Sequence, residues 1–308
     1  MFPKLKYQLI LQVNVLLWGL TGILGDRILF AGASEMEAAA RIVFYRTAVA
    51  SVFFLVVFVA MRHFRIISFK QMAIYFSVGV IIAAHWYAFF YSIKVSTVEI
   101  GVVCMSMMAF FTSLIEPLVQ KRKVRPSEIL LSVLSIAGMV MIFGFESKYS
   151  LGIFWGLVCA LLATVFTLLN AKLVKSEKAL TLTAYEMFGA VGISIVVLLM
   201  TSGKLELDPG AENHAYILIL GLLCTSIAFL IGVWVIQHLS PFTACLAVNL
   251  EPVYTILMLA GLDMYLGNRI NSMSLGFYVG AAIIISAVII NAVLKAREAQ
   301  RQRAKVDE

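Results

Sequence analysis

Residues 91–114, with the sequence YSIKVSTVEIGVVCMSMMAFFTSL, share a faint pattern with residues 234–257, WVIQHLSPFTACLAVNLEPVYTIL. Small, aromatic and polar positions recur between these stretches at an offset of 143 residues. A second pair, VLLWGLTGILGDRIL at 15–29 and ALLATVFTLLNAKLV at 160–174, repeats at an offset of 145. Both offsets are close to half of the 308-residue chain, which predicts an internal repeat.

The composition is that of an integral membrane protein. Hydrophobic residues make up 62% of the chain and charged residues only 13%, about half of the share that is usual in soluble domains. The net charge of +7 does not indicate a nucleic-acid partner, because the basic residues lie in short loops between apolar segments rather than on one face. We therefore take the lipid bilayer as the surroundings of most of the chain.

Ten segments are long and apolar enough to span a bilayer as helices. They lie at 7–30, 38–61, 71–93, 96–120, 127–145, 150–171, 179–201, 214–237, 241–266 and 273–294. Each repeat has five helices, which is an odd number of membrane crossings. The second copy therefore enters the membrane from the opposite side, as in many secondary transporters. The predicted fold is an all-α integral membrane protein with ten transmembrane helices in two inverted five-helix repeats. The predicted units are 1–147, 148–296 and a basic cytoplasmic tail, 297–308.

The loop charges predict that both termini are cytoplasmic. Of the 24 Lys and Arg residues, five lie in the predicted outer segments (Arg27, Lys94, Lys148, Lys204 and Arg269), two lie within the second helix, and the other 17 are inside. The first apolar segment exceeds a signal peptide and lacks a cleavage site, so it is expected to remain as an anchor in the cell inner membrane. The basic tail is either an orientation signal on anionic lipid or a partner site.

Charged groups inside the apolar segments are the main candidates for function. Each costs roughly 2.5–3.5 kcal/mol at the bilayer centre, so such groups usually face a cavity or a partner. The candidates are Arg41, Arg46, Glu186 and Glu251, with Glu116 nearer a helix end. Arg41 and Glu186 occupy equivalent repeat positions, and we hypothesise that they pair in one conformation. Local pairing or snorkelling of Arg41 is the alternative.

Two Glu-Pro pairs, at Glu116–Pro117 and Glu251–Pro252, place proline inside predicted helices. Proline frees the carbonyl four residues back, which in lipid must find a partner or face water. Asn249 lies beside that freed carbonyl of the second pair. The motif predicts either a polar notch lining an aqueous path or a kink with the glutamate held in a hydrogen bond. We assign Glu116, Pro117, Glu251, Pro252, Arg41 and Glu186 to coupling or gating.

Substrate contacts are predicted from helices 2 and 3. Arg46 lies deeper than Arg41 and suits an anionic ligand such as a carboxylate. His85 and Trp86 lie among aromatic residues, which fits either a cavity wall for an amphipathic solute or a packed helix interface. The GFYVG stretch at 276–280 favours helix packing and leaves a homodimer open.

The sequence carries no signal of an enzyme, a metal site or a cofactor. The four histidines lack metal-ligand spacing, and the four cysteines all lie in apolar segments rather than outer loops. No nucleotide-binding or hydrolase motif appears. We expect no enzymatic activity, no metal site and no cofactor.

The chain resembles the drug/metabolite transporter superfamily, specifically the EamA-type permeases. The resemblance rests on LLWGLTGIL, IVFYRTAVA, HWYAFFYSIKVSTVEIGVV, NLEPVYTIL and LGFYVGAAIIISAVI, in that order along the chain. It implies ten helices in two inverted repeats and export of small metabolites, often amino acids or related compounds. By this likeness, residues at family pattern positions are Trp18, Arg46, His85, Trp86, Asn249, Glu251 and Pro252. The usual Gly-Glu pair at the end of helix 9 is missing, and Asp263 is the candidate substitute.

The predicted function is secondary-active export of a small organic metabolite by alternating access through a central cavity. The predicted substrate-binding residues are Arg46, His85, Trp86, Trp18, Tyr45, Asn249, Glu251 and Tyr254. The sequence leaves proton coupling, through Glu251 or Glu116, open. The alternative function is a polytopic membrane receptor or scaffold without a transport cycle.

Overall fold

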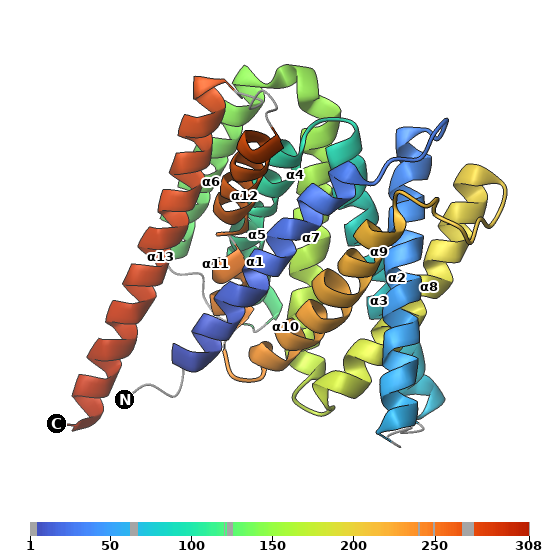
Figure 1. Cartoon of the computed structure of the whole chain (residues 1–308). Coiled ribbons are helices and arrows are strands. Elements are labelled where there is room, and N and C mark those ends of the chain that lie inside the picture. Colours follow the sequence, from blue (N-terminus) through green and yellow to red (C-terminus); the bar gives the residue numbers. More distant parts are fainter. Residues whose placement is uncertain are drawn as a thin grey trace.

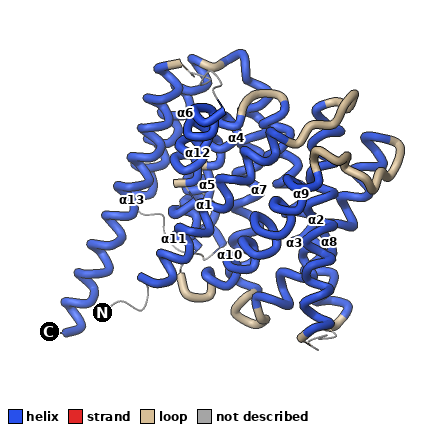
Figure 2. The backbone as a smooth tube through the Cα atoms, in the orientation of Figure 1, coloured by secondary structure: helices blue, strands red, loops and turns tan. Residues whose placement is uncertain are grey.

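The computed structural model describes residues 5–61, 67–119, 121, 126–239, 241–248, 250–266 and 274–307, and this part of the chain contains helices and no strands. The first half holds α1 (Leu5–Arg27), α2 (Glu35–Ala60), α3 (Phe69–Lys94), α4 (Val98–Met105), α5 (Met107–Val119) and α6 (Pro126–Phe145). After the short turn η1 (Ser147–Tyr149), the second half holds α7 (Ser150–Leu173), α8 (Ala179–Ser202), α9 (His214–Gly221), η2 (Leu222–Ile227), α10 (Ala228–Ile236), α11 (Pro241–Val248), α12 (Glu251–Leu266) and α13 (Leu275–Asp307). Nearly all loops lie at the two ends of the helices (Figure 2).

Local sequence explains where several helices begin and end. Ser34 caps α2 by accepting a hydrogen bond from the Glu37 N–H, and Ser68 forms a capping box with Gln71 at the start of α3. Thr97 caps α4 in the same way. Gly203 ends α8 with φ of +73°, a left-handed conformation that glycine adopts without strain. Polar caps therefore stand at the boundaries of otherwise apolar segments.

Seven helical segments in the described part of the chain are long and apolar enough to cross a membrane. They are Lys6–Arg27, Glu35–Ala60, Phe69–Lys94, Val98–Val119, Ser147–Leu173, Ala179–Ser202 and His214–Ile236. Leu275–Ala287 is a shorter apolar helical stretch. The helices α6 and α11–α12 occupy the ranges expected for the fifth and ninth spans. The multi-pass helical architecture is confirmed, and the count of ten spans stays a prediction.

Two of the expected spans are each divided into two helices, and the divisions fall at matching repeat positions. Ser106 interrupts the fourth span between α4 and α5, while the ninth span breaks between Val248 and Glu251. The eight residues of α4, shifted by 143, coincide with the eight residues of α11. The structure thus repeats the same discontinuity in both halves, a feature typical of transporter helices at binding sites.

The break changes the interpretation of Pro252. A kink inside a continuous helix was expected, but Pro252 is the second residue of α12, and Leu250 lies in a turn before it. The expectation is wrong because proline in a first helical turn lacks only an N–H that would have no intrahelical partner there. Pro117, by contrast, lies inside α5 as expected.

The two halves run in opposite directions and interlock. In Figure 1, α1 rises from the end of the molecule where the C-terminus of α13 also lies, whereas its repeat mate α7 descends. Helix α1 packs against α10 and α12 of the second half, and α7 packs against α3 and α4 of the first. Helices α6 and α13 cross at Gly138 and Gly280, where a Cβ on either would lie 2.7 Å from the other's carbonyl oxygen. These contacts are those of an inverted repeat.

The C-terminal segment, predicted as a basic cytoplasmic tail, is helical. Helix α13 continues to Asp307 and extends beyond the neighbouring helices (Figure 1). The predicted start of the basic tail at residue 297 falls within this helix, which has no proline or glycine there to stop it, and the cytoplasmic location of the tail stays a prediction.

Candidate functional site

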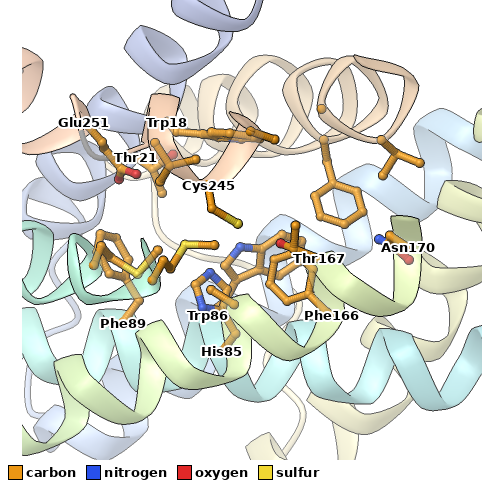
Figure 3. Close-up of a pocket in the computed structure, with 18 of the residues that line it drawn as sticks. Trp18, Thr21, His85, Trp86, Phe89, Phe166, Thr167, Asn170, Cys245 and Glu251 are labelled. Carbon is orange, nitrogen blue, oxygen red and sulfur yellow. The ribbon is translucent and has the colours of Figure 1, made fainter. Parts of the chain in front are cut away.

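A cavity lies among helices of both halves, and Figure 3 shows it with most of the residues that line it. Helices α1, α2, α3, α7, α10, α11 and α12 contribute to the wall, with Met105 and Met108 beside the α4–α5 break. The wall is mostly apolar, and its aromatic members are Trp18, Trp86, Phe89, Phe166 and Phe229. Its polar side chains are Thr21, Arg46, His85, Thr167, Asn170 and Glu251. Such a wall suits an organic solute with few charged groups.

Arg46 is the strongest electrostatic feature of the cavity wall. Its residue surface is only 1% exposed, and its Nε donates a hydrogen bond to Thr225 Oγ1 at 3.0 Å. The guanidinium lies 4.0 Å from the centre of the Trp86 ring and 5.3 Å from that of Phe90. Nη1 is buried without a hydrogen-bond partner, and no carboxylate among the described residues forms an ion pair with Arg46. A buried cation thus reaches the cavity with one donor group unused.

Thr225, which holds Arg46, belongs to the π-helical turn η2 rather than to a regular helix. Its hydroxyl donates to the Leu220 carbonyl at 2.6 Å, and Ser226 bonds to Gly221 in the same five-residue pattern at 2.7 Å. π-Helical turns occur often at functional sites because they widen the helix and re-aim its side chains. Sequence reasoning missed Thr225, since a threonine in an apolar helix carries no marker for such a turn.

His85 lies on the cavity wall with one ring nitrogen already engaged. Nδ1 lies 3.0 Å from the Cys159 carbonyl oxygen and 3.2 Å from the Cys159 sulfur. Because a carbonyl only accepts, Nδ1 carries the proton in this arrangement and Nε2 is the acceptor. The ring packs edge-on against Phe166 with centroids 5.2 Å apart. The histidine is therefore fixed in orientation by α7.

The labelled polar residues of the cavity wall are distributed over its length. In Figure 3, Glu251 lies near Trp18 and Thr21 at one side, and Asn170 lies at the other, with His85, Trp86 and Cys245 between them. Glu251, the first residue of α12, is 5% exposed and forms no ion pair within the described chain. The discontinuity of the ninth span thus brings a carboxylate to the cavity.

The structure brings Trp18, Arg46, His85, Trp86 and Glu251 together on this wall. The two tyrosines predicted beside them do not line it. Tyr45 donates its hydroxyl to the Glu206 carbonyl oxygen at 2.9 Å, and Tyr254 donates to Gln12 Oε1 at 2.9 Å. Asn249 lies outside the described residues. Asn170, Thr21 and Thr167 were missed, although Asn170 is the one amide in a long apolar helix and offered a signal.

The hypothesised pair of Arg41 and Glu186 is absent from this conformation. Arg41 donates two hydrogen bonds to Glu37 Oε1, at 2.9 and 2.6 Å, and forms an ion pair with Glu206. Glu186 is fully buried in α8 and contacts Asn170 instead. Glu116 and Pro117 are buried in α5 and do not line the cavity. Local pairing of Arg41, the alternative, is what the structure contains.

At the end of the molecule opposite the termini, the start of α2 in the first half is tied to the loop between α8 and α9 in the second half. Arg41 and Lys204 both form ion pairs with Glu206, and we term the group Glu37, Arg41, Lys204 and Glu206 the interloop cluster. The pKa of Glu206 is lowered from its ordinary value, first by the Lys204 hydrogen bond and further by Arg41.

Hydrogen bonds and one ion pair reinforce this link at the same end. The Asn213 side chain donates to the Leu29 carbonyl at 2.7 Å and accepts from the Leu29 N–H at 3.3 Å. Asp263, the candidate helix-end carboxylate, lies 3.6 Å from Arg27. The polar groups at this end therefore join the first half to the second, and they do not face the cavity.

Comparison with known families decides the identity of the fold. The model of the EamA-like transporter family matches residues 5–144 and again residues 150–293. The chain belongs to this family. The EamA match in two copies confirms the internal repeat, and the family is one of membrane transporters in the drug/metabolite superfamily.

Solved structures share the overall fold of this chain. One of them, named only as "Crystal structure of protein", is 15% identical in sequence and matches with a TM-score of 0.65, over 94% of this chain and 98% of its own. At that identity the likeness shows the fold alone. None of the curated proteins matches this chain. The family thus points to a multi-pass transporter rather than an enzyme. The family match does not identify the solute, so the class of solute has to be inferred from the residues that line the cavity.

Proposed function

We propose that this protein is a secondary-active exporter of a small organic metabolite that carries a carboxylate, such as an amino acid or a related compound. The observation that supports this most is the buried guanidinium of Arg46, which reaches the cavity with Nη1 unused and no carboxylate partner among the described residues. A carboxylate on the solute would supply the missing charge and accept the unused N–H.

The rest of the cavity wall favours an apolar, preferably aromatic, body on that solute. Trp18, Trp86, Phe89, Phe166 and Phe229 offer ring faces and edges to a bound group. Glu251 would accept hydrogen bonds from a primary amine on the solute, as Arg46 would bind its carboxylate. His85 offers Nε2 as a further acceptor, and Asn249 is proposed to complete the polar notch at the start of α12.

Alternating access would be served by the two divided spans and by the interloop cluster. The breaks at Ser106 and before Glu251 give both halves a point at which short helices are able to reorient. Opening the end that carries the cluster requires the Arg41–Glu206 ion pair to break. In this proposal Glu116, Pro117, Glu251 and Pro252 adjust the helices around the cavity, and Arg41 stabilises the closed end.

The remaining predicted features belong to the same proposal. The units are 1–147 and 148–296, with ten spans, cytoplasmic termini and a location in the cell inner membrane. Export rather than uptake follows from the family resemblance. Gly276 and Gly280 of the GFYVG stretch pack against α6, so a homodimer would have to form through another surface. The solute and the bilayer are the partners that the proposal requires.

Transport by reconstituted protein tests the proposal against the receptor or scaffold alternative. Phenylalanine carries both a carboxylate and an amine. 3-Phenylpropionate carries only the carboxylate, and phenethylamine carries only the amine. We expect counterflow of labelled phenylalanine in proteoliposomes, inhibition by 3-phenylpropionate, and weaker inhibition by phenethylamine. Binding of these probes without any flux would favour a receptor, and preference for the amine alone would contradict the role of Arg46.

A further inference from the structure

A second acidic site lies behind the cavity wall, at Glu186. This residue is in the first half of α8 and is 0% exposed. Its Oε2 lies 3.4 Å from Asn170 Nδ2, and its Oε1 is buried without a hydrogen-bond partner. Glu186 does not line the cavity itself, but Asn170 does. The carboxyl group is therefore one side chain removed from the solute.

No cation neutralises this carboxyl group in the described structure. Helices α2, α3 and α10 pack against α8, and α7 supplies Asn170. Their titratable side chains include Arg41, Tyr45 and Arg46 on α2, Tyr75 and His85 on α3, and Cys159 and Lys172 on α7; α10 carries none, and Tyr185 precedes Glu186 on α8 itself. Arg41 pairs with Glu37 and Glu206, Arg46 bonds to Thr225, and His85 bonds to Cys159. A buried carboxylate without a counter-ion is strongly disfavoured, whereas the protonated acid is neutral.

Close helix packing limits access to Glu186 from the side of α3. A Cβ at Gly79 would collide with the Glu186 backbone oxygen and would lie 2.9 Å from the Ala190 nitrogen, so the two backbones touch there. Asn170, by contrast, is 1% exposed and forms part of the cavity wall. Asn170 is therefore the side chain that links Glu186 to the cavity.

We propose that Glu186 is a proton-binding site and that the Asn170 amide transmits its protonation state to the cavity. When Glu186 is ionised, Asn170 Nδ2 donates to it and Oδ1, which is buried without a partner, is the group left for the cavity. When Glu186 is protonated, its O–H donates to Oδ1 of a flipped amide and leaves an N–H donor for the solute. The proton comes from cavity water and returns to it, and no other bond changes.

This arrangement would couple proton binding to solute binding. The amine of the solute prefers the state in which Asn170 offers Oδ1, so the solute binds better when Glu186 is ionised. By reciprocity, the bound solute lowers the affinity of Glu186 for its proton, so that proton and solute exchange, as proton-driven export requires. This coupling step rests on the proposed function, whereas the existence of the proton site does not.

Infrared spectroscopy of the purified full-length protein tests the site without any solute. We expect a carbonyl band of a protonated carboxyl that disappears in Glu186→Gln and titrates as the pH is raised. Glu99→Gln is the matched control, because Glu99 is another buried carboxyl that lies outside the cavity wall, in the first turn of α4. It should leave this band in place. Asn170→Ser keeps Glu186, and in this variant the pH at which the carboxyl band half disappears should shift. With this second variant, the test does not depend on Glu186→Gln folding correctly.

The outcomes separate this proposal from the proposed function. A band absent from both wild type and Glu186→Gln, or one that never titrates, overturns the proton site whatever the protein transports. In proteoliposomes, Glu186→Gln should retain phenylalanine counterflow and lose accumulation driven by a pH gradient. If the variant responds to the gradient as wild type does, the coupling is refuted, while failure of all phenylalanine flux in wild type would refute the proposed function alone.

Discussion

Gly189 permits the close contact of α8 with α3, and replacing Gly189 by alanine should force these helices apart. A Cβ at Gly189 would lie 2.6 Å from Phe76 Cα and 2.7 Å from Phe76 O, whereas ordinary contact begins at 3.4 Å. The shortfall is 0.8 Å to the first atom and 0.7 Å to the second. Both atoms are backbone, so no side chain is able to move aside. Overpacking of this kind costs roughly 1–3 kcal/mol.

Gly192 provides a matched control on the same helix. It lies three residues further along α8, is exposed, and has nothing within 4 Å of its ideal Cβ. Alanine brings both positions the same gain in helix propensity, up to about 1 kcal/mol. The difference between the two variants therefore isolates the overpacking at Gly189.

Equilibrium unfolding in mixed detergent micelles, titrated with sodium dodecyl sulfate, measures this difference. We expect Gly189→Ala to have a free energy of unfolding about 1–3 kcal/mol below that of Gly192→Ala. Equal stability of the two variants would refute the close backbone contact, and with it the packing that encloses Glu186 between α3 and α8.

Two further predictions concern the end of the molecule where the loops meet. The lowered pKa of Glu206 means that its ion pairs are fully formed above the ordinary carboxyl pKa and are lost as the pH falls through the lowered value. Spin labels placed in loops 28–34 and 203–213 should therefore move apart in wild type as the pH falls, and should be far apart at every pH in Glu206→Gln. The same dependence of the distance on pH in both proteins would contradict this. Asn213→Ala removes three hydrogen bonds of a buried side chain and should cost roughly 1–3 kcal/mol of unfolding free energy. Exposed Glu212→Ala, its neighbour, should change stability by less than about 0.5 kcal/mol, and similar losses in both variants would show that the Asn213 bonds contribute nothing.

Sequence periodicity and length were enough to find the helices, because in a bilayer every backbone group must be satisfied within its own segment. They did not reveal the break at Ser106, where no proline or glycine stands. The break before Glu251 was expected only as a kink. Both divisions depend on how the two halves pack, and a pattern read along one chain does not contain that information.

The candidate site was predictable where a rare residue marked it. Arg46 and Glu251 stood out because charges are costly in apolar segments, and both lie on the cavity wall. The partner of Arg41 was missed because Glu206 is 165 residues away, in a loop whose conformation the repeat does not define. Thr225 was missed for a related reason, since only the tertiary contact with Arg46 distinguishes it from other threonines.

Isothermal titration of 3-phenylpropionate into wild type and Arg46→Gln tests most directly whether Arg46 binds a solute carboxylate. Hydrogen bonds to a charged group contribute roughly 1.5–3 kcal/mol, so the variant should bind this probe about ten- to a hundredfold more weakly. Arg46→Lys should fall between the two, and phenethylamine should bind all three proteins alike. Equal affinity of wild type and Arg46→Gln for 3-phenylpropionate would contradict the account.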